Sequence, residues 1–213
     1  MRERRLLICC DTRPGYAMST IQTESLQNSK TVLLLVDFIN PLRFDGAEQL
    51  APSALAAARR TARLRQHLKA GGVRSVYAND NYGEWTSDFK ALWRRCQAMS
   101  GASGRMATLM APKRRDFAVL KPRHSAFYST PLHLLLEQLH CQRLVVTGIA
   151  ADSCVFFTAM DAYLRGYSLW VPADCVAAES DEARDRALEQ MARVLKADIR
   201  PFKELKGSTK KRR

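Results

Sequence analysis

The chain has 213 residues, of which 46% are apolar and 26% are charged, and its formal net charge is +13. This length and composition suit one compact domain and exclude a disordered chain. The sequence holds no apolar run near the roughly 20 residues that span a bilayer, which excludes a transmembrane helix.

The two ends of the sequence differ in composition from its middle. Residues 1–28 start with basic side chains and an apolar patch that is shorter than a signal-peptide core, usually about 7–15 residues. We expect a flexible extension over 1–28, one domain over 29–205 and a basic, disordered tail over 206–213. A basic tail can attract nucleic acid, but no aromatic side chain interleaves with these charges, so we expect a solvated end.

The six cysteines form neither a CxxC pair nor a Cys/His zinc pattern. Without a secretory signal, this usage favours reduced thiols and predicts a cytoplasmic protein. The cysteines are Cys9, Cys10, Cys96, Cys141, Cys154 and Cys175.

Apolar runs alternate with helical patterns along the chain. The expected strands cover 31–37, 73–80, 117–121, 143–148, 167–174 and, as a short sixth strand, 198–202. The expected helices cover 52–72, 87–99, 129–140, a segment from about 153, and 180–197. The alternation predicts an α/β fold of three layers (α/β/α) around a doubly wound, mostly parallel sheet of about six strands.

Chemically active residues stand where these strands end. Asp37, Asp80 and Lys121 close the first three expected strands, and a loop of small residues leads from the fourth to Cys154. In open parallel sheets, ligands bind at the carboxyl ends of the strands. We therefore expect two acids, a lysine and a cysteine to converge at one edge of the sheet.

Cys154 allows two interpretations. Asp152 and Ser153 can begin a helix, and a thiol in the first helical turn faces the positive end of the helix dipole, which lowers its pKa. The backbone N–H groups of that turn can also stabilise an oxyanion. The alternative is a core cysteine that packs against Val146 or Val155.

Asp37 and Lys121 each have a structural alternative as well. Asp37 can cap the turn that follows it, and Lys121 can be an exposed lysine at a strand end. Together with Cys154 they suit the activation of a thiol, because a carboxylate can accept the proton of the thiol and an ammonium favours the thiolate. Such a Cys–Asp–Lys group suits attack on a carbonyl carbon.

With these residues in place, the chain resembles the isochorismatase-like cysteine hydrolases, the superfamily of nicotinamidases and N-carbamoylsarcosine amidases. The resemblance covers about 31–202. It is carried, in chain order, by "LLLVDFIN" with Asp37, "LKPRHSAFYSTPL" with Lys121, "VVTGIAADSCVFFTAMDAYLRGY" with Cys154, and "VPADCVAAES".

The resemblance implies a fold, a mechanism and site residues. Asp37 takes the proton of Cys154, the thiolate attacks an amide-type carbonyl, and Lys121 positions Asp37. The oxyanion lies on the N–H groups of Ala150 and Cys154, and the Ile149–Ala150 peptide bond is expected to be cis. A thioester intermediate is then hydrolysed by water, so the implied enzyme cleaves a small amide, carbamoyl or ureido compound.

The sequence departs from this family in two places. Nicotinamidases carry a metal site written Asp-x-His, whereas here Asp80 fits the acid and Tyr82 stands at the histidine position. His124 lies near the expected site but lacks a partner histidine at suitable spacing. We therefore expect no metal and no cofactor. Ala151 replaces a threonine common among relatives, which leaves the fine positioning of the nucleophile loop open.

Loops after the strand ends supply candidates for substrate binding. Asn40, Asn81, Trp85 and Phe127 are the candidates we retain, with Phe44 and Tyr82 in the same loops. Aromatic rings with a few amides suit a small, partly planar substrate. Each aromatic residue also has a packing alternative, such as Phe127 lying beneath the lysine loop.

Three functions remain open on the sequence. The first is the amidohydrolase, the second is an isochorismatase-type vinyl ether hydrolase, and the third is a non-catalytic binding protein on the same fold. We expect a small-molecule substrate, no membrane partner and no nucleic-acid partner. The resemblance also implies a homo-oligomer, either a dimer or a tetramer.

Overall fold

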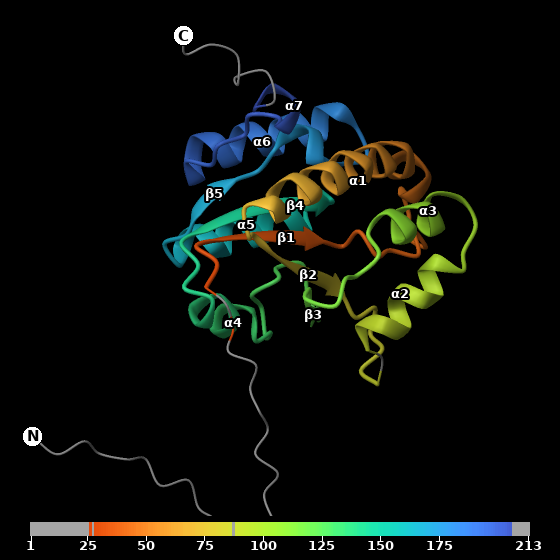
Figure 1. The fold of residues 1–213 in the computed structure, drawn as a ribbon. Helices are drawn as coiled ribbons and strands as arrows, with labels where there is room; N and C mark the ends of the chain where they lie inside the picture. Colours follow the sequence, from red (N-terminus) through yellow and green to blue (C-terminus); the bar gives the residue numbers. More distant parts are fainter. Residues whose placement is uncertain (1–25, 27, 87, 206–213) are drawn as a thin grey trace, which may run out of the picture.

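The computed structural model describes residues 26, 28–86 and 88–205. The tail 206–213 and nearly all of the extension 1–28 lie outside the described residues. The chain folds around a central sheet that is covered by helices on both faces (Figure 1).

The sheet has six strands, and all of its strand pairs are parallel. Its main path runs in the order β3-β2-β1-β4-β5, and β6 pairs with the end of β4. The strands are β1 (Thr31–Val36), β2 (Arg74–Asp80), β3 (Phe117–Lys121), β4 (Arg143–Ile149), β5 (Ser168–Trp170) and β6 (Val176–Ala177). This confirms the predicted fold class.

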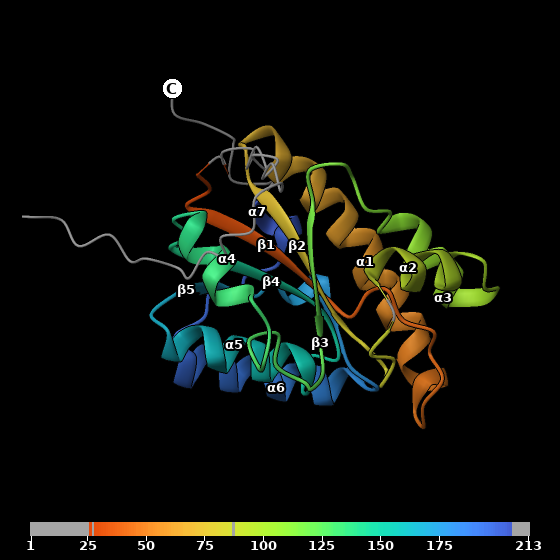
Figure 2. The same ribbon diagram turned by 90° about the horizontal axis from the view of Figure 1, so that it is seen from below.

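The helices form two layers, one on each face of the sheet (Figure 2). One layer consists of α1 (Ala47–Ala70), α2 (Phe89–Gln97) and α3 (Gly101–Leu109). The other consists of α4 (Leu132–Gln138), α5 (Cys154–Leu164) and α6 (Asp181–Leu195). A short 3₁₀-helix, η1 (Ala173–Cys175), and a last turn, α7 (Phe202–Leu205), complete the described chain. None of the helices in the described residues is long and apolar enough to cross a bilayer.

The burial of strand β1 on both faces explains why its sequence is an unbroken apolar run. Val32 and Val36 pack into the core under α4, α5 and α6, whereas Leu33 and Leu35 pack into the core under α1, α2 and α3. All four side chains are fully buried. A strand that is covered on both faces needs apolar residues at every position.

The last two strands differ from the prediction. The expected strand 167–174 is only three residues long, because Pro172 offers no N–H and leads into η1. The expected sixth strand at 198–202 is wrong: Asp198 forms an isolated bridge with Trp170, and Phe202 already begins α7. The sixth strand is β6, which pairs with Gly148 and Ile149.

Two helices also differ from the prediction. Helix α1 begins at Ala47 and holds Pro52 inside it, whereas the sequence suggested a start at Pro52. Helix α3 was missed, because two glycines lie in its nine residues. Gly104 is required there by packing, since a Cβ at this position would lie 1.9 Å from the carbonyl oxygen of Met99.

The order of the strands places one crevice at the centre of the sheet. The chain runs outward from β1 through β2 to β3, and then returns to β4 on the other side of β1. The direction of winding therefore reverses between β1 and β4, which is where open α/β sheets bind ligands. Asp37 follows one of these strands, and the loop to Cys154 follows the other.

Candidate active site

Asp37 is held rigidly at the end of β1. Its backbone is in the left-handed region, with φ of 50°, a conformation that aspartate tolerates better than most residues. Its N–H donates to the carbonyl oxygen of Ala78 at 3.0 Å, and its Oδ1 accepts the N–H of Asp80 at 2.7 Å. The side chain is buried, with 3% of the residue exposed. One carboxylate oxygen is thus fixed to the backbone, and the other, Oδ2, faces Lys121.

Lys121 links the members of the site. Its side chain is fully buried, and its Nζ lies 2.8 Å from Oδ2 of Asp37 and 3.6 Å from Oδ2 of Asp80. The same Nζ lies 3.4 Å from Sγ of Cys154. Because Asp80 and Lys121 are partners in the register of β2 and β3, the sheet itself brings these charges together.

Cys154 is the first residue of α5 and is half-buried. Gly148 allows the end of β4 to approach β1: its φ is 137°, and a Cβ there would lie 2.0 Å from the carbonyl oxygen of Val36. A side chain at this position would push the two strand ends apart. The glycine therefore keeps Cys154 beside Asp37.

The loop between β4 and α5 leaves two backbone donors unused. The N–H groups of Ala151, Ser153 and Val155 all donate to backbone carbonyl oxygens, at 2.7 to 3.1 Å. Within the described residues, the N–H groups of Ala150 and Cys154 make no such bond. The peptide bond that precedes Ala150 is cis. Two free donors beside a thiol are what an oxyanion hole requires.

The pKa values of the three groups reflect their burial. Burial raises the pKa of Asp37 above its usual value, although Lys121 opposes this shift. Burial would lower the pKa of Lys121, but the negative groups around it, Asp37 first, outweigh this and raise it. Burial and the nearby Asp37 raise the pKa of the Cys154 thiol to about 12. This shift is opposite in direction to the lowering expected from the position of Cys154 in the first turn of a helix.

His124 contacts the nucleophile loop. Its Nδ1 lies 3.7 Å from Sγ of Cys154 and 3.4 Å from Oγ of Ser153, and its ring stacks on Phe157. The sequence placed His124 near the site but gave it no role. The available signal was its position three residues after Lys121, on the same loop.

The predicted asparagines are used to shape loops. Asn40 is buried, and its Oδ1 accepts the N–H of Leu42 at 2.8 Å. Asn81 accepts the N–H of Gly83 through its Oδ1 at 3.0 Å, and its own N–H donates to the carbonyl oxygen of Lys121 at 3.1 Å. The side-chain oxygen atoms of both residues accept hydrogen bonds within backbone turns, and both asparagines flank the site.

The predicted aromatic residues lie in different surroundings. Trp85 is 80% exposed. Phe127 is 5% exposed and belongs to the core under α4, α5 and α6, where its ring stacks on Tyr167 and lies 4.8 Å from the Arg165 guanidinium carbon. The structure therefore gives Phe127 a packing role, in line with the alternative raised from the sequence.

A cavity of about 430 Å³ adjoins the site at Tyr82. The backbone N–H of Tyr82 donates to Oδ1 of Asp80 at 2.6 Å, and burial, followed by the charge of Asp37, raises the pKa of the Tyr82 hydroxyl well above its usual value. The volume lies in the range of small-molecule sites. The cavity is lined by Pro41, Arg43, Phe44, Tyr82, Glu84, Arg95 and Met99.

The site does not have the ligands of the nicotinamidase metal. Asp80 already accepts the N–H of Tyr82 at 2.6 Å and faces Lys121, while Tyr82 stands where a histidine would be needed. In the part of the chain that the structure describes, no three His, Cys, Asp or Glu side chains gather as a metal site. The residues present therefore do not match the Asp-x-His ligand pattern of that metal site.

Comparison with known proteins identifies the family. Residues 31–198 match the isochorismatase domain. The chain is 40% identical over 174 residues to YaaI, an uncharacterized isochorismatase family protein of Bacillus subtilis, over 82% of this chain and 95% of YaaI. It is 29% identical over 172 residues to the ureidoacrylate amidohydrolase RutB of Methylorubrum extorquens, over 68% of each chain.

A solved structure agrees with these sequence matches. N-carbamoylsarcosine amidase from Thermoplasma acidophilum has a TM-score of 0.62 and 26% identity, over 81% of this chain and 96% of the amidase. The three-layer architecture is thus that of the isochorismatase-like hydrolases. The chain belongs to the isochorismatase family, as its motifs predicted.

Proposed function

We propose that this protein is a metal-independent cysteine amidohydrolase that cleaves a small amide, carbamoyl or ureido compound. The observation that carries the proposal is the position of one buried ammonium. Lys121 Nζ lies 2.8 Å from the Asp37 carboxylate and 3.4 Å from the Cys154 sulfur. This arrangement joins a base, a cation and a nucleophile at the switch point of the sheet.

The first step forms a thioester. The Asp37 carboxylate takes the proton of the Cys154 thiol, and the sulfur attacks the carbonyl carbon of the substrate. The negative charge that develops on the carbonyl oxygen is stabilised by the N–H groups of Ala150 and Cys154. Lys121 stays charged and holds Asp37 in place. Asp37 then gives its proton to the leaving nitrogen, the C–N bond breaks, and the amine departs.

The second step hydrolyses the thioester. Asp37, again ionised, takes a proton from a water molecule that attacks the thioester carbonyl. The C–S bond breaks, and the proton held by Asp37 returns to the Cys154 sulfur. The base and the nucleophile therefore regain their resting states after each cycle.

Two further observations support this proposal over the alternatives. The named relatives with a stated activity, RutB and the Thermoplasma protein, are an amidohydrolase and an amidase. The raised pKa of Cys154 also suits a thiol that reacts only when a base is beside it. For the substrate, the adjoining cavity offers Arg43 and Arg95, although Arg95 is paired with Glu84 at 2.6 Å.

The proposal also covers the cellular location and the oligomeric state of the protein. A small-molecule substrate fits the cavity, and we propose a cytoplasmic location and a homo-oligomer of two or four subunits. Sedimentation of the purified protein tests the assembly. A monomer at micromolar concentration would contradict it.

A substrate screen tests the proposed function. Small amides, carbamoyl compounds and ureido acids are incubated with the enzyme, and ammonia release is measured. We expect release from at least one class, and its loss in Cys154→Ala. Isochorismate is included, because its cleavage without any ammonia release would support the vinyl ether hydrolase instead. Binding of these compounds without turnover would support the non-catalytic protein.

A further inference from the structure

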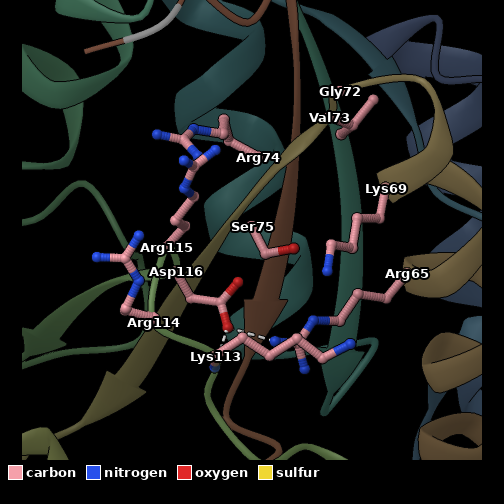
Figure 3. A pocket seen from close by; sticks show the side chains of 10 residues that line it. All are labelled: Arg65, Lys69, Gly72, Val73, Arg74, Ser75, Lys113, Arg114, Arg115 and Asp116. Carbon is pink, nitrogen blue, oxygen red and sulfur yellow. Dashed lines mark hydrogen bonds and ion pairs between the residues drawn. The ribbon is translucent and has the colours of Figure 1, made fainter. Parts of the chain in front are cut away.

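A second cavity, of about 340 Å³, lies at the opposite end of the strands from Cys154. It is formed by the end of α1, the start of β2 and the segment that leads into β3 (Figure 3). Six of its ten lining residues are basic, and one is acidic. The basic residues are Arg65, Lys69, Arg74, Lys113, Arg114 and Arg115.

Asp116, the acidic residue of the cavity, is already engaged. It pairs with the buried Arg65 and accepts the backbone N–H of Lys113 (Figure 3). Arg65 also donates to the carbonyl oxygen of Ala111 at 3.1 Å and lies over the ring of Tyr77. Arg65 and Asp116 therefore stabilise the local structure and neutralise each other's charge.

The other basic side chains lack a counter-charge. Among the described residues, none of the other five basic side chains forms an ion pair. Arg74 lies against the ring of Phe117, and its buried Nε has no hydrogen-bond partner. Like charges that gather unpaired around a concave surface repel one another, so the cavity is unfavourable without an anion.

The unpaired basic side chains lie on more than one side of the cavity. Figure 3 shows Arg74 and Arg115 on one side of the Ser75 side chain, and Lys69 on the other. Ser75 is itself buried, with 6% of the residue exposed. The guanidinium of arginine donates two parallel hydrogen bonds to phosphate oxygens, whereas the ammonium of lysine attracts them as a point charge. A hydroxyl can add a further hydrogen bond. Cations on two sides suit a ligand with more than one phosphate.

We propose that this cavity binds a small molecule with two or more linked phosphate groups, either an inorganic polyphosphate or a nucleoside di- or triphosphate. Its volume is that of a small-molecule site. Arg74 and Ser75, which line the cavity, lie at the start of β2, and Asp80 lies at its end, about 17–20 Å away, so the cavity is distinct from the thiol site. A concave cavity favours a compact ligand over the extended backbone of a nucleic acid.

Calorimetric titration with inorganic tripolyphosphate tests the proposal. The full chain is compared with the double variant Lys69→Gln, Arg115→Gln, whose side chains are exposed and whose loss should leave the fold intact. A matched control, Arg63→Gln, Arg186→Gln, removes the same charge from exposed positions outside the cavity. We expect the cavity variant to lose at least about tenfold in affinity and the control to lose less than about threefold.

Two further arms locate the ligand and distinguish its two possible sources. Cys154→Ala should bind tripolyphosphate as the parent does, whereas its loss of binding would locate the ligand at the thiol and overturn the proposal. ATP in parallel distinguishes the two ligand sources, because tighter binding of ATP indicates a nucleotide and tighter binding of tripolyphosphate indicates a polyphosphate.

The proposal is overturned if tripolyphosphate does not bind at millimolar concentration, or if the control variant loses as much affinity as the cavity variant. It is also overturned if single-stranded RNA displaces tripolyphosphate with an affinity that rises with RNA length. Unchanged thermal unfolding of the cavity variant without ligand checks that its fold is intact.

Discussion

At the scale of single residues, the site depends on charges that are buried together. Asp37 is 3% exposed and Lys121 is fully buried, so neither can exchange its partner for water. Such a pair contributes little to stability as a whole, but leaving one member alone is costly. The same burial raises the pKa of both the Asp37 carboxyl and the Cys154 thiol, which favours their protonated forms.

The variant Lys121→Met should destabilise the protein by about 3–5 kcal/mol, because it leaves the Asp37 carboxylate buried without a partner. The double variant Asp37→Asn, Lys121→Met should recover most of this loss. Urea unfolding measures both effects. Turnover should stay at least about 100-fold reduced in the double variant, since the base is gone. Equal destabilisation of the single and double variants would show that the pair is not coupled.

The pH dependence of kcat/KM should reveal the raised pKa of Asp37. A raised pKa means that the carboxyl binds its proton at a higher pH than ordinary aspartic acid, so the base is lost earlier as the pH falls. We expect the acid limb to lie clearly above 3.8, the usual value for aspartate. A basic limb caused by the thiol belongs near its pKa of about 12, so the profile should stay flat through mildly alkaline pH. An acid limb at or below 3.8 would contradict this assignment.

At the scale of elements, the approach of β4 to β1 decides whether the site can form. Asp37 and Cys154 belong to two different strand-to-loop junctions, and Gly148 pairs with Val36 at the end of β1, with room for no Cβ between them. The remaining geometry follows from the register, since Val36 pairs with Gly148 and Asp80 pairs with Lys121. A shift of one residue in either pairing would separate the groups.

The variant Gly148→Ala should lose both stability and turnover, because its Cβ would meet the carbonyl oxygen of Val36 at 2.0 Å. We expect a loss of about 2–4 kcal/mol, of which about 1 kcal/mol or more is the cost of the positive φ alone. Gly166→Ala is a matched control, since its φ is also positive, at 82°, but nothing lies within 4 Å of the new Cβ. Thermal unfolding and ammonia release are measured for both. Equal losses in the two variants would exclude the steric cause.

At the scale of the whole molecule, the two sites lie at opposite ends of the same strands. Both are formed by described residues between Asp37 and Cys154. The basic cavity shares no lining residue with the group formed by Asp37, Lys121 and Cys154. Each site can therefore be altered without the other.

Truncation after Leu205 should leave turnover within about twofold of the full chain, because no part of the proposed machinery is removed. Retention on a heparin column should fall, since five basic residues are lost. Steady-state kinetics and salt elution measure the two effects. A large loss of turnover with an unchanged fold would give the tail a role in catalysis.

The sequence predicted those features that depend on strand ends. The convergence of Asp37, Lys121 and Cys154 follows from parallel pairing, so the strand ends alone were sufficient to predict it. The contact of His124 with Cys154 depends on the path of one loop, and no periodic pattern in the sequence predicts it. Phe127 could equally fill a pocket or a core, because an aromatic ring suits both. Helix α3 was missed because its glycines oppose a helix by propensity, and only tertiary packing explains them.

The full burial of Lys121 determines how the rate of the proposed reaction should depend on ionic strength. During the proposed attack a proton moves from sulfur to carboxylate, so the enclosed group of ionisable side chains keeps the same total charge from reactant to proton-transferred state. Mobile ions screen charges in water far more effectively than charges that water cannot reach. The chemical step should therefore proceed at nearly the same rate in dilute and concentrated salt, even though the chain around it carries a net charge of +13.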